Sequence, residues 1–112
     1  MAEHSFEVKF YRVKLSNGTI GATAFVGYLN CLDASANWTS QFTVYFLTEG
    51  TSLPPSSYNA SNKMGASYRP ISQMALYLDL LRNEKPVFAE MSDANPNLNA
   101  LRTWPEPVGE GE

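Results

Sequence analysis

The sequence predicts a mainly β domain with one helix, in which five strands follow the order β-β-β-α-β-β. Apolar and polar residues alternate with period two over long stretches between residues 6 and 49, as they do in half-buried strands. Residues 71–83, by contrast, are strong helix formers with no glycine. At 112 residues and 44% hydrophobic, the chain suits a single compact domain with a modest core.

The first predicted strand, residues 6–15 (FEVKFYRVKL), alternates but changes sides halfway along. Its apolar residues keep one parity and then the other: Phe6, Val8 and Phe10, followed by Tyr11, Val13 and Leu15. A β-bulge inserts one residue, switches the side-chain parity and increases the twist. We therefore expect a bulge at Phe10 and Tyr11 that turns all of these side chains to the interior.

Two further strands are expected to complete a meander. Asn17-Gly18 after Ser16 is a strong hairpin signal, and it predicts that the first strand turns directly into a second at residues 19–29. Residues 30–40 have the composition of a loop. Aromatic and β-branched residues then predict a third strand at residues 41–49.

The next segment, residues 50–70, is rich in Ser, Pro, Asn and Gly, and it predicts a long loop that covers part of the domain. Pro70 suits the first turn of a helix at residues 71–83. Apolar residues surround more of this helix than one core requires. In so small a domain, the second apolar face predicts contact with another subunit, through Met74, Tyr77, Leu78 and Leu81.

Lys85-Pro86 ends the helix, because the residue before a proline avoids the α conformation. A fourth strand is expected at residues 87–91, a turn at residues 92–97 and a fifth strand at residues 98–104. We expect one domain at residues 1–105, followed by an acidic, flexible tail at residues 106–112.

This order of elements is that of the OB-fold, a five-stranded, partly open Greek-key barrel. The first strand of such a barrel bends sharply and serves both halves, which is a role for the bulge expected at Phe10 and Tyr11. The alternative is an α+β fold, in which a flat antiparallel sheet packs on one helix.

Three short stretches carry a resemblance to a known family: Met64-Gly-Ala-Ser-Tyr68, Gln73-Met-Ala-Leu-Tyr-Leu78 and Lys85-Pro-Val87. The matched region extends from residue 64 to residue 87, about a quarter of the chain. The three stretches resemble the helix and the following strand of the B subunits of subtilase-cytotoxin-like and typhoid-toxin-like bacterial AB toxins. The resemblance implies an OB-fold, a pentameric ring with the helix lining its centre, and a glycan as ligand.

The chain departs from that family in two respects. Members of the group carry disulfides, which a chain with Cys31 alone does not form within itself. Their sialic-acid site uses a serine near the first strand and a tyrosine in the strand after the helix, where this chain has Val8 and Met91. The resemblance therefore implies the fold and the ring, and does not carry over that glycan site.

The charge and the residue patterns of the sequence limit the classes of binding partner that we expect. A net charge of −3 without any run of Lys or Arg disfavours nucleic acid. Nowhere do about eighteen apolar residues run together, so no membrane span is expected. The start MAEHSFEV has no secretory signal, but a mature secreted protein with an added Met1 would begin in the same way. The sequence therefore does not identify the cellular compartment. No nucleotide, metal or other cofactor motif occurs, and no cofactor is expected.

No catalytic residue is expected. His4 lies in a terminus expected to fray, and Cys31 is expected to be a buried structural thiol. A hydrolytic acid and base need only two carboxylates that lie close together with split pKa values. The carboxylates in ordered segments are expected on the surface, and they are Asp33, Glu49, Asp79, Glu90 and Asp93.

Aromatic residues are the better candidates for recognition. Their faces, beside Asn and Ser, suit sugar rings and equally suit a subunit interface. The candidates are Tyr28, Trp38, Tyr45, Tyr58 and Tyr68. We therefore expect a non-enzymatic binding or assembly protein, a homo-oligomer that binds a glycan. The alternatives are a single-stranded nucleic-acid-binding OB protein and a small carboxylate-dependent hydrolase.

Overall fold

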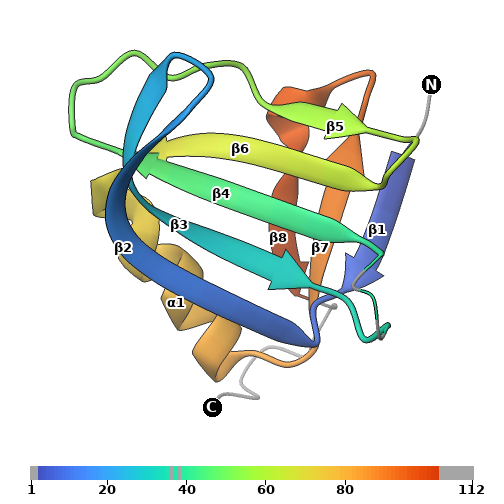
Figure 1. Ribbon diagram of the computed structural model, residues 1–112. Helices are drawn as coiled ribbons and strands as arrows, with labels where there is room; N and C mark the ends of the chain where they lie inside the picture. Colours follow the sequence, from blue (N-terminus) through green and yellow to red (C-terminus); the bar gives the residue numbers. More distant parts are fainter. Residues whose placement is uncertain (1–2, 36, 38, 104–112) are drawn as a thin grey trace.

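The computed structural model describes residues 3–35, 37 and 39–103, which form strands, one α-helix and two short 3₁₀ helices (Figure 1). The strands before the helix are β1 (Glu3–Glu7), β2 (Phe10–Ile20), β3 (Thr23–Leu32), β4 (Gln41–Leu47), β5 (Ser57–Asn59) and β6 (Met64–Pro70). A 3₁₀ turn (Ile71–Gln73) leads into α1 (Met74–Asn83). β7 (Val87–Ser92), a second 3₁₀ turn (Pro96–Leu98) and β8 (Ala100–Thr103) follow.

The strands form two open sheets. One has the order β2-β3-β4-β6-β5 and the other the order β1-β7-β8. All neighbours are antiparallel except β4 and β6, which are parallel. In Figure 1, α1 and the three-stranded sheet both lie behind the five-stranded sheet. The prediction of a mainly β fold with one helix is confirmed. The predicted strand order and the single closed barrel are not, because six strands precede the helix and the sheets stay open.

The first predicted strand is divided between the two sheets. β1 pairs with β7, whereas β2 pairs with β3. The change occurs between adjacent residues. The Val8 N–H donates to the Val87 carbonyl at 2.8 Å, and the Lys9 N–H donates to the Leu32 carbonyl at 3.0 Å. One chain segment therefore serves both sheets, as expected, but the change lies before the predicted position.

The apolar residues of FEVKFYRVKL are buried only in its first half. Phe6 is 8% exposed and belongs to the core. From Phe10 onward the prediction of interior positions is wrong, because the exposed fractions are 55%, 37%, 39% and 71% for Phe10, Tyr11, Val13 and Leu15. β2 is the terminal strand of its sheet, and a terminal strand has a neighbour on one side only.

β2 also continues past the predicted hairpin turn. Asn17 and Gly18 lie inside β2, at a register shift between Leu15 and Gly18. A Cβ on Gly18 would lie 2.6 Å from Cζ of Phe25, so this position requires glycine for close approach. The turn comes at Gly21, whose φ of +60° favours glycine. The Asn-Gly pair therefore marks a bulge and not the turn that we predicted.

Residues 50–70 contain two strands in place of the predicted loop. β5 and β6 form a hairpin, and β6 lies beside β4. The core side of β6 carries the small residues Gly65 and Ser67, and a Cβ on Gly65 would lie 2.5 Å from Sδ of Met91. Glycine is depleted in strands, which explains why the sequence pattern concealed this one.

The core lies between the two sheets and α1. Alternate residues of β3 and β4 are fully buried, namely Leu29, Cys31, Phe42, Val44 and Phe46. Val87, Ala89 and Met91 of β7 alternate in the same way. The predicted antiparallel meander is confirmed for β2, β3 and β4. Asn30 to Leu32, predicted as loop, belong to the end of β3.

The predicted helix and fourth strand are confirmed as the 3₁₀ turn with α1 and as β7. β8 is shorter than the predicted fifth strand, because Pro96–Leu98 forms a 3₁₀ turn that leaves Leu98 exposed. Across the described residues, no helix has the length and apolar character that crossing a bilayer requires. The tail predicted at residues 106–112 lies outside the described residues.

Candidate functional site

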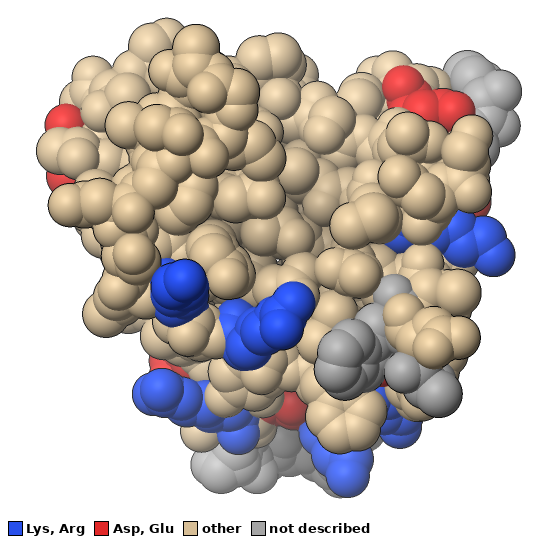
Figure 2. Space-filling view, in the orientation of Figure 1, with Lys and Arg blue, Asp and Glu red and all other residues tan. Residues whose placement is uncertain are grey.

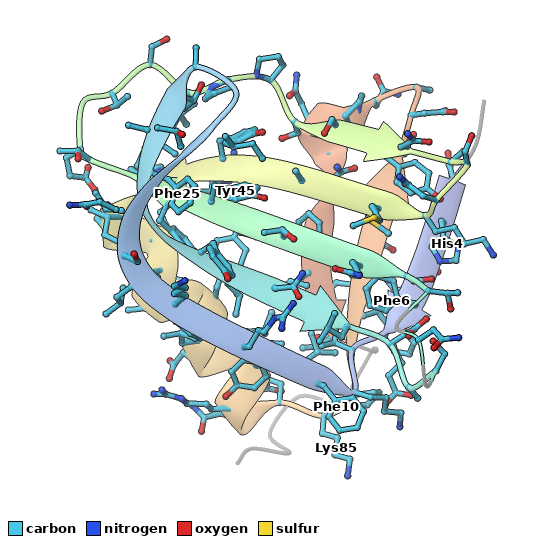
Figure 3. The ribbon with its side chains drawn as sticks, in the orientation of Figure 1. His4, Phe6, Phe10, Phe25, Tyr45 and Lys85 are labelled. Carbon is cyan, nitrogen blue, oxygen red and sulfur yellow. The ribbon has the colours of Figure 1, made fainter. Side chains whose placement is uncertain are left out.

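Four aromatic side chains lie together on the face of the five-stranded sheet that is opposite the core. Tyr28 of β3 is paired with Tyr45 of β4, and Tyr45 is paired with Tyr68 of β6. Phe25, further along β3, completes the group. In Figure 3, Phe25 and Tyr45 lie next to each other on the near side of the sheet. We call these four residues the aromatic face.

The rings of the aromatic face are in mutual contact. Tyr45 and Tyr68 stack with centroids 5.5 Å apart and planes 20° apart. The Phe25 centroid lies 5.2 Å from that of Tyr45 and 6.0 Å from that of Tyr28. Burial, and then the neighbouring Tyr68 and Tyr28, raise the pKa of Tyr45. The Tyr45 hydroxyl therefore stays protonated at neutral pH and is able both to donate and to accept a hydrogen bond.

A polar network adjoins the aromatic face on the same side of the sheet. Its centre is Asn30, which is only 4% exposed. The Asn30 amide donates to Oγ1 of Thr43 at 2.9 Å and to Oε1 of Gln41 at 3.3 Å. Nε of Arg12 donates to the Asn30 carbonyl oxygen at 3.1 Å. We call these four residues the polar network, and its bonds hold the Arg12 guanidinium in place.

The polar network and three rings of the aromatic face line one shallow depression, and the fourth ring, Tyr68, stacks on Tyr45 beside it. The depression has a volume of about 350 Å³, and its lining includes Arg12, Phe25, Tyr28, Asn30 and Tyr45. Figure 2 shows the same side of the molecule, with Lys and Arg side chains across its lower half and few charges above them. An apolar platform beside fixed polar groups is the usual composition of a small-ligand site.

Three of the predicted ligand-binding residues therefore belong to the site: Tyr28, Tyr45 and Tyr68. Tyr58 does not, because it is buried in the core from β5, where its ring is parallel to that of His4 at 6.4 Å. Trp38 lies outside the described residues. We did not predict Phe25, nor any member of the polar network. The sequence did hold an indication of the polar network, because residues two apart in a strand share one face. Asn30 is two residues from Tyr28, and Thr43 is two residues from Tyr45.

The residues predicted for the subunit interface pack on the chain's own core. Met74 is 8% exposed and belongs to the core cluster. Tyr77, Leu78 and Leu81 are partly buried against that cluster. The Tyr77 ring meets Phe46 edge-on with centroids 5.8 Å apart, and its hydroxyl oxygen accepts a hydrogen bond from Nε of Arg69. The exposed apolar residue of α1 is instead Leu76, at 69%.

His4 does not lie in a frayed end, as we expected, but in β1. Its Nε2 lies 2.8 Å from Oγ of Ser40, the residue before β4. Burial and the nearby Lys63 lower the pKa of His4, although Asp33 acts in the opposite direction. A serine and a histidine at this distance resemble the first pair of a nucleophilic site. Ser40, however, is only 4% exposed and is not accessible to a substrate.

The candidate carboxylates have structural partners. Asp33 accepts hydrogen bonds from Ser35, Thr39 and Ser40, and these bonds lower its pKa in spite of burial. Glu49 accepts from the Ser72 N–H at 2.8 Å, and its pKa is lowered by this residue.

The remaining carboxylates are also engaged. Asp79 accepts from Asn83, and Glu90 pairs with Arg102. Burial raises the pKa of the Tyr58 phenol, and the nearby Asp93 carboxylate raises it further. Among the described residues, no group of three or more His, Cys, Asp or Glu side chains forms a metal site.

The aromatic face with its polar network is thus the site that the described residues support best. Comparisons of the chain with protein-family models, with curated proteins and with solved structures found no match.

Proposed function

We propose that this protein is a non-enzymatic binding protein whose aromatic face binds a glycan. The observation that carries the proposal is the contact of Phe25, Tyr28, Tyr45 and Tyr68 in one layer beside the polar network. A sugar ring has apolar C–H faces and an edge of hydroxyl groups. The aromatic layer complements the C–H faces, and the hydroxyl and amide groups of the network complement the edge.

A glycan-array screen followed by calorimetry tests this function. Tyr45→Ala removes the central ring and is expected to weaken binding by about tenfold or more, as loss of a central aromatic anchor does in other interfaces. Tyr11→Ala is the matched control, because Tyr11 is an exposed tyrosine of β2 outside the aromatic face. Equal affinities of the two variants, or no binding to any glycan, would reject the proposal.

We further propose an OB-like arrangement and a homo-oligomer that forms a ring of the toxin-subunit type. The continuous chain from β1 to β2, which enters both sheets, supports the OB-like arrangement. The 69% exposure of Leu76 supports contact between copies through the outer side of α1, in place of the core-facing side. Light scattering tests the oligomer. A monomer at micromolar concentration would reject it, and Leu76→Glu is expected to convert an oligomer to monomers.

A second candidate function is binding of single-stranded nucleic acid. The observation that favours it is the position of Arg12 and Lys14, which face Asn30 and Tyr28 and so lie on the same side of the sheet as the stacked rings. Bases stack on aromatic side chains, and cations follow the phosphates. The test is binding of a single-stranded oligonucleotide over a range of salt concentrations. Affinity that falls steeply with salt favours nucleic acid, and affinity for a neutral glycan that is insensitive to salt favours the first function.

A further inference from the structure

The outer edge of β2 has an exposed backbone that the proposed functions do not use, although they use the side chains of Arg12 and Lys14. β2 is the terminal strand of the five-stranded sheet, so among the described residues one side of its backbone has no strand neighbour. Residues 10–15 are all exposed, and Phe10 extends outward from the start of the strand (Figure 3). An unpaired edge of this length is a template for another strand.

The two faces of this edge differ in chemistry. Tyr11, Val13 and Leu15 are opposite Cys31, Leu29 and Gly27, so they lie on the core side of the sheet. Arg12 and Lys14 are opposite Asn30 and Tyr28, so they lie on the other side. A strand that extends the sheet must alternate in the same way, because directly opposite residues share a face. Its side chains would be apolar on the core side and acidic on the other.

A second copy of β2 does not meet this requirement. We consider antiparallel pairing of β2 with a second copy in three registers. Centred on Arg12, the pairing places the two Arg12 side chains opposite each other, and centred on Lys14 it places the two Lys14 side chains opposite each other. Centred on Val13, it places Arg12 of each copy opposite Lys14 of the other. Like charges in directly opposite positions are destabilising. The two cations therefore act against self-pairing and favour a strand of opposite charge.

We propose that the β2 edge binds an extended segment of a partner protein in which acidic and apolar residues alternate, and that this segment adds a strand to the five-stranded sheet. Main-chain hydrogen bonds along β2 provide affinity, as in other cases of strand addition. Arg12 and Lys14 select acidic side chains on one face. Tyr11, Val13 and Leu15 pack against apolar side chains on the other.

The experiment uses labelled synthetic peptides and the full chain. The first peptide alternates Glu and Val over the length of residues 10–15, the second alternates Lys and Val, and the third has the composition of the first in an order without alternation. We expect binding of the first peptide alone. Hydrogen exchange is expected to show new protection of amides within residues 10–15 and none in β5, the opposite edge of the sheet.

Variants of the protein test the charge selection. The double variant Arg12→Glu, Lys14→Glu is expected to weaken binding of the Glu–Val peptide by about tenfold, since two favourable charge pairs become repulsive. It is also expected to bind the Lys–Val peptide, since the two repulsive pairs with that peptide become favourable. Lys14→Glu alone leaves the bond from Arg12 to Asn30 intact and is expected to weaken binding by about threefold. Lys63→Glu, an exposed position between β5 and β6 at the opposite edge of the sheet, is the matched control and should have no effect.

Several outcomes would overturn the proposal. They are absence of binding to the Glu–Val peptide, equal binding of all three peptides, or protection of β5 in place of β2. Self-association that the double variant abolishes would also overturn it, because β2 would then serve as a contact between copies. Glycan binding by wild-type protein is measured in parallel, so that failure of the glycan proposal is distinguished from failure of this one.

Discussion

Asn30 illustrates what one residue contributes on the side of the sheet that carries the aromatic face. Its side chain accepts a hydrogen bond from Arg12 and donates to Gln41 and Thr43, so it links residues of β2 and β4. It is nearly inaccessible to solvent, and a buried polar group that loses its partner costs more than the bond itself contributed. Asn30 therefore organises the polar network without being accessible to a ligand.

We predict that Asn30→Ala lowers the free energy of unfolding by about 1–3 kcal/mol, because the hydrogen bonds of Asn30 with Arg12 and Thr43 are lost. Urea denaturation measures this change. Asn17→Ala is the control, since Asn17 is exposed in β2. A loss of the same size in the two variants would contradict the role assigned to Asn30.

Cys31 is a residue for which sequence and structure agree. It is fully buried in β3, and burial raises its pKa to about 12. At pH 8 the thiol of the folded protein is therefore protonated as well as inaccessible. We predict that a thiol reagent such as dithionitrobenzoate does not react with native protein at pH 8 and reacts fully in denaturant. Rapid reaction without denaturant would show that β3 is not buried as described.

At the scale of elements, β6 shows why parts of the fold were not predictable. Its core side carries Gly65 and Ser67, so the apolar alternation that indicates a strand is missing. The position of β6 beside β4 depends on the space that these small residues leave for Met91. By contrast, α1 and β4 were predictable, because α1 consists of strong helix formers without glycine and β4 is rich in aromatic and β-branched residues.

We predict that Gly65→Val is far more destabilising than Ala66→Val. The added side chain at position 65 collides with Met91, and overpacking of this kind typically costs about 1–3 kcal/mol. Ala66 is the matched neighbour, because it points to the opposite face of the same strand. Thermal unfolding of the two variants measures the difference. Similar melting temperatures would show that β6 does not pack against β7 through this contact.

At the scale of the whole molecule, His4 connects the two sheets. It belongs to β1 of the three-stranded sheet, and its partner Ser40 precedes β4 of the five-stranded sheet. The charged groups that act on it are Lys63, which disfavours its protonation, and Asp33, which favours it. The net pKa is lowered from 6.5, so the unfolded chain binds the proton more readily than the folded chain.

We predict that stability falls on acidification through the range just below pH 6.5, because the unfolded state takes up more protons there. The contribution of His4 is the difference between the pH profiles of wild type and His4→Gln, measured by denaturant unfolding. The two profiles are expected to be parallel above about pH 7.5 and to converge on acidification. Profiles that stay parallel down to pH 5 would exclude this role of His4.

Local residue patterns were enough to locate the strands at β3, β4 and β7 and the helix after Pro70. Which strands are neighbours, and which of their faces is buried, depends on how the whole chain packs. Period two indicates that a segment is extended, but it does not specify its partner or what covers its faces. FEVKFYRVKL therefore pairs in both sheets, and the change occurs between Val8 and Lys9. Its second half stays exposed, because the alternation of a strand does not specify whether another element covers it.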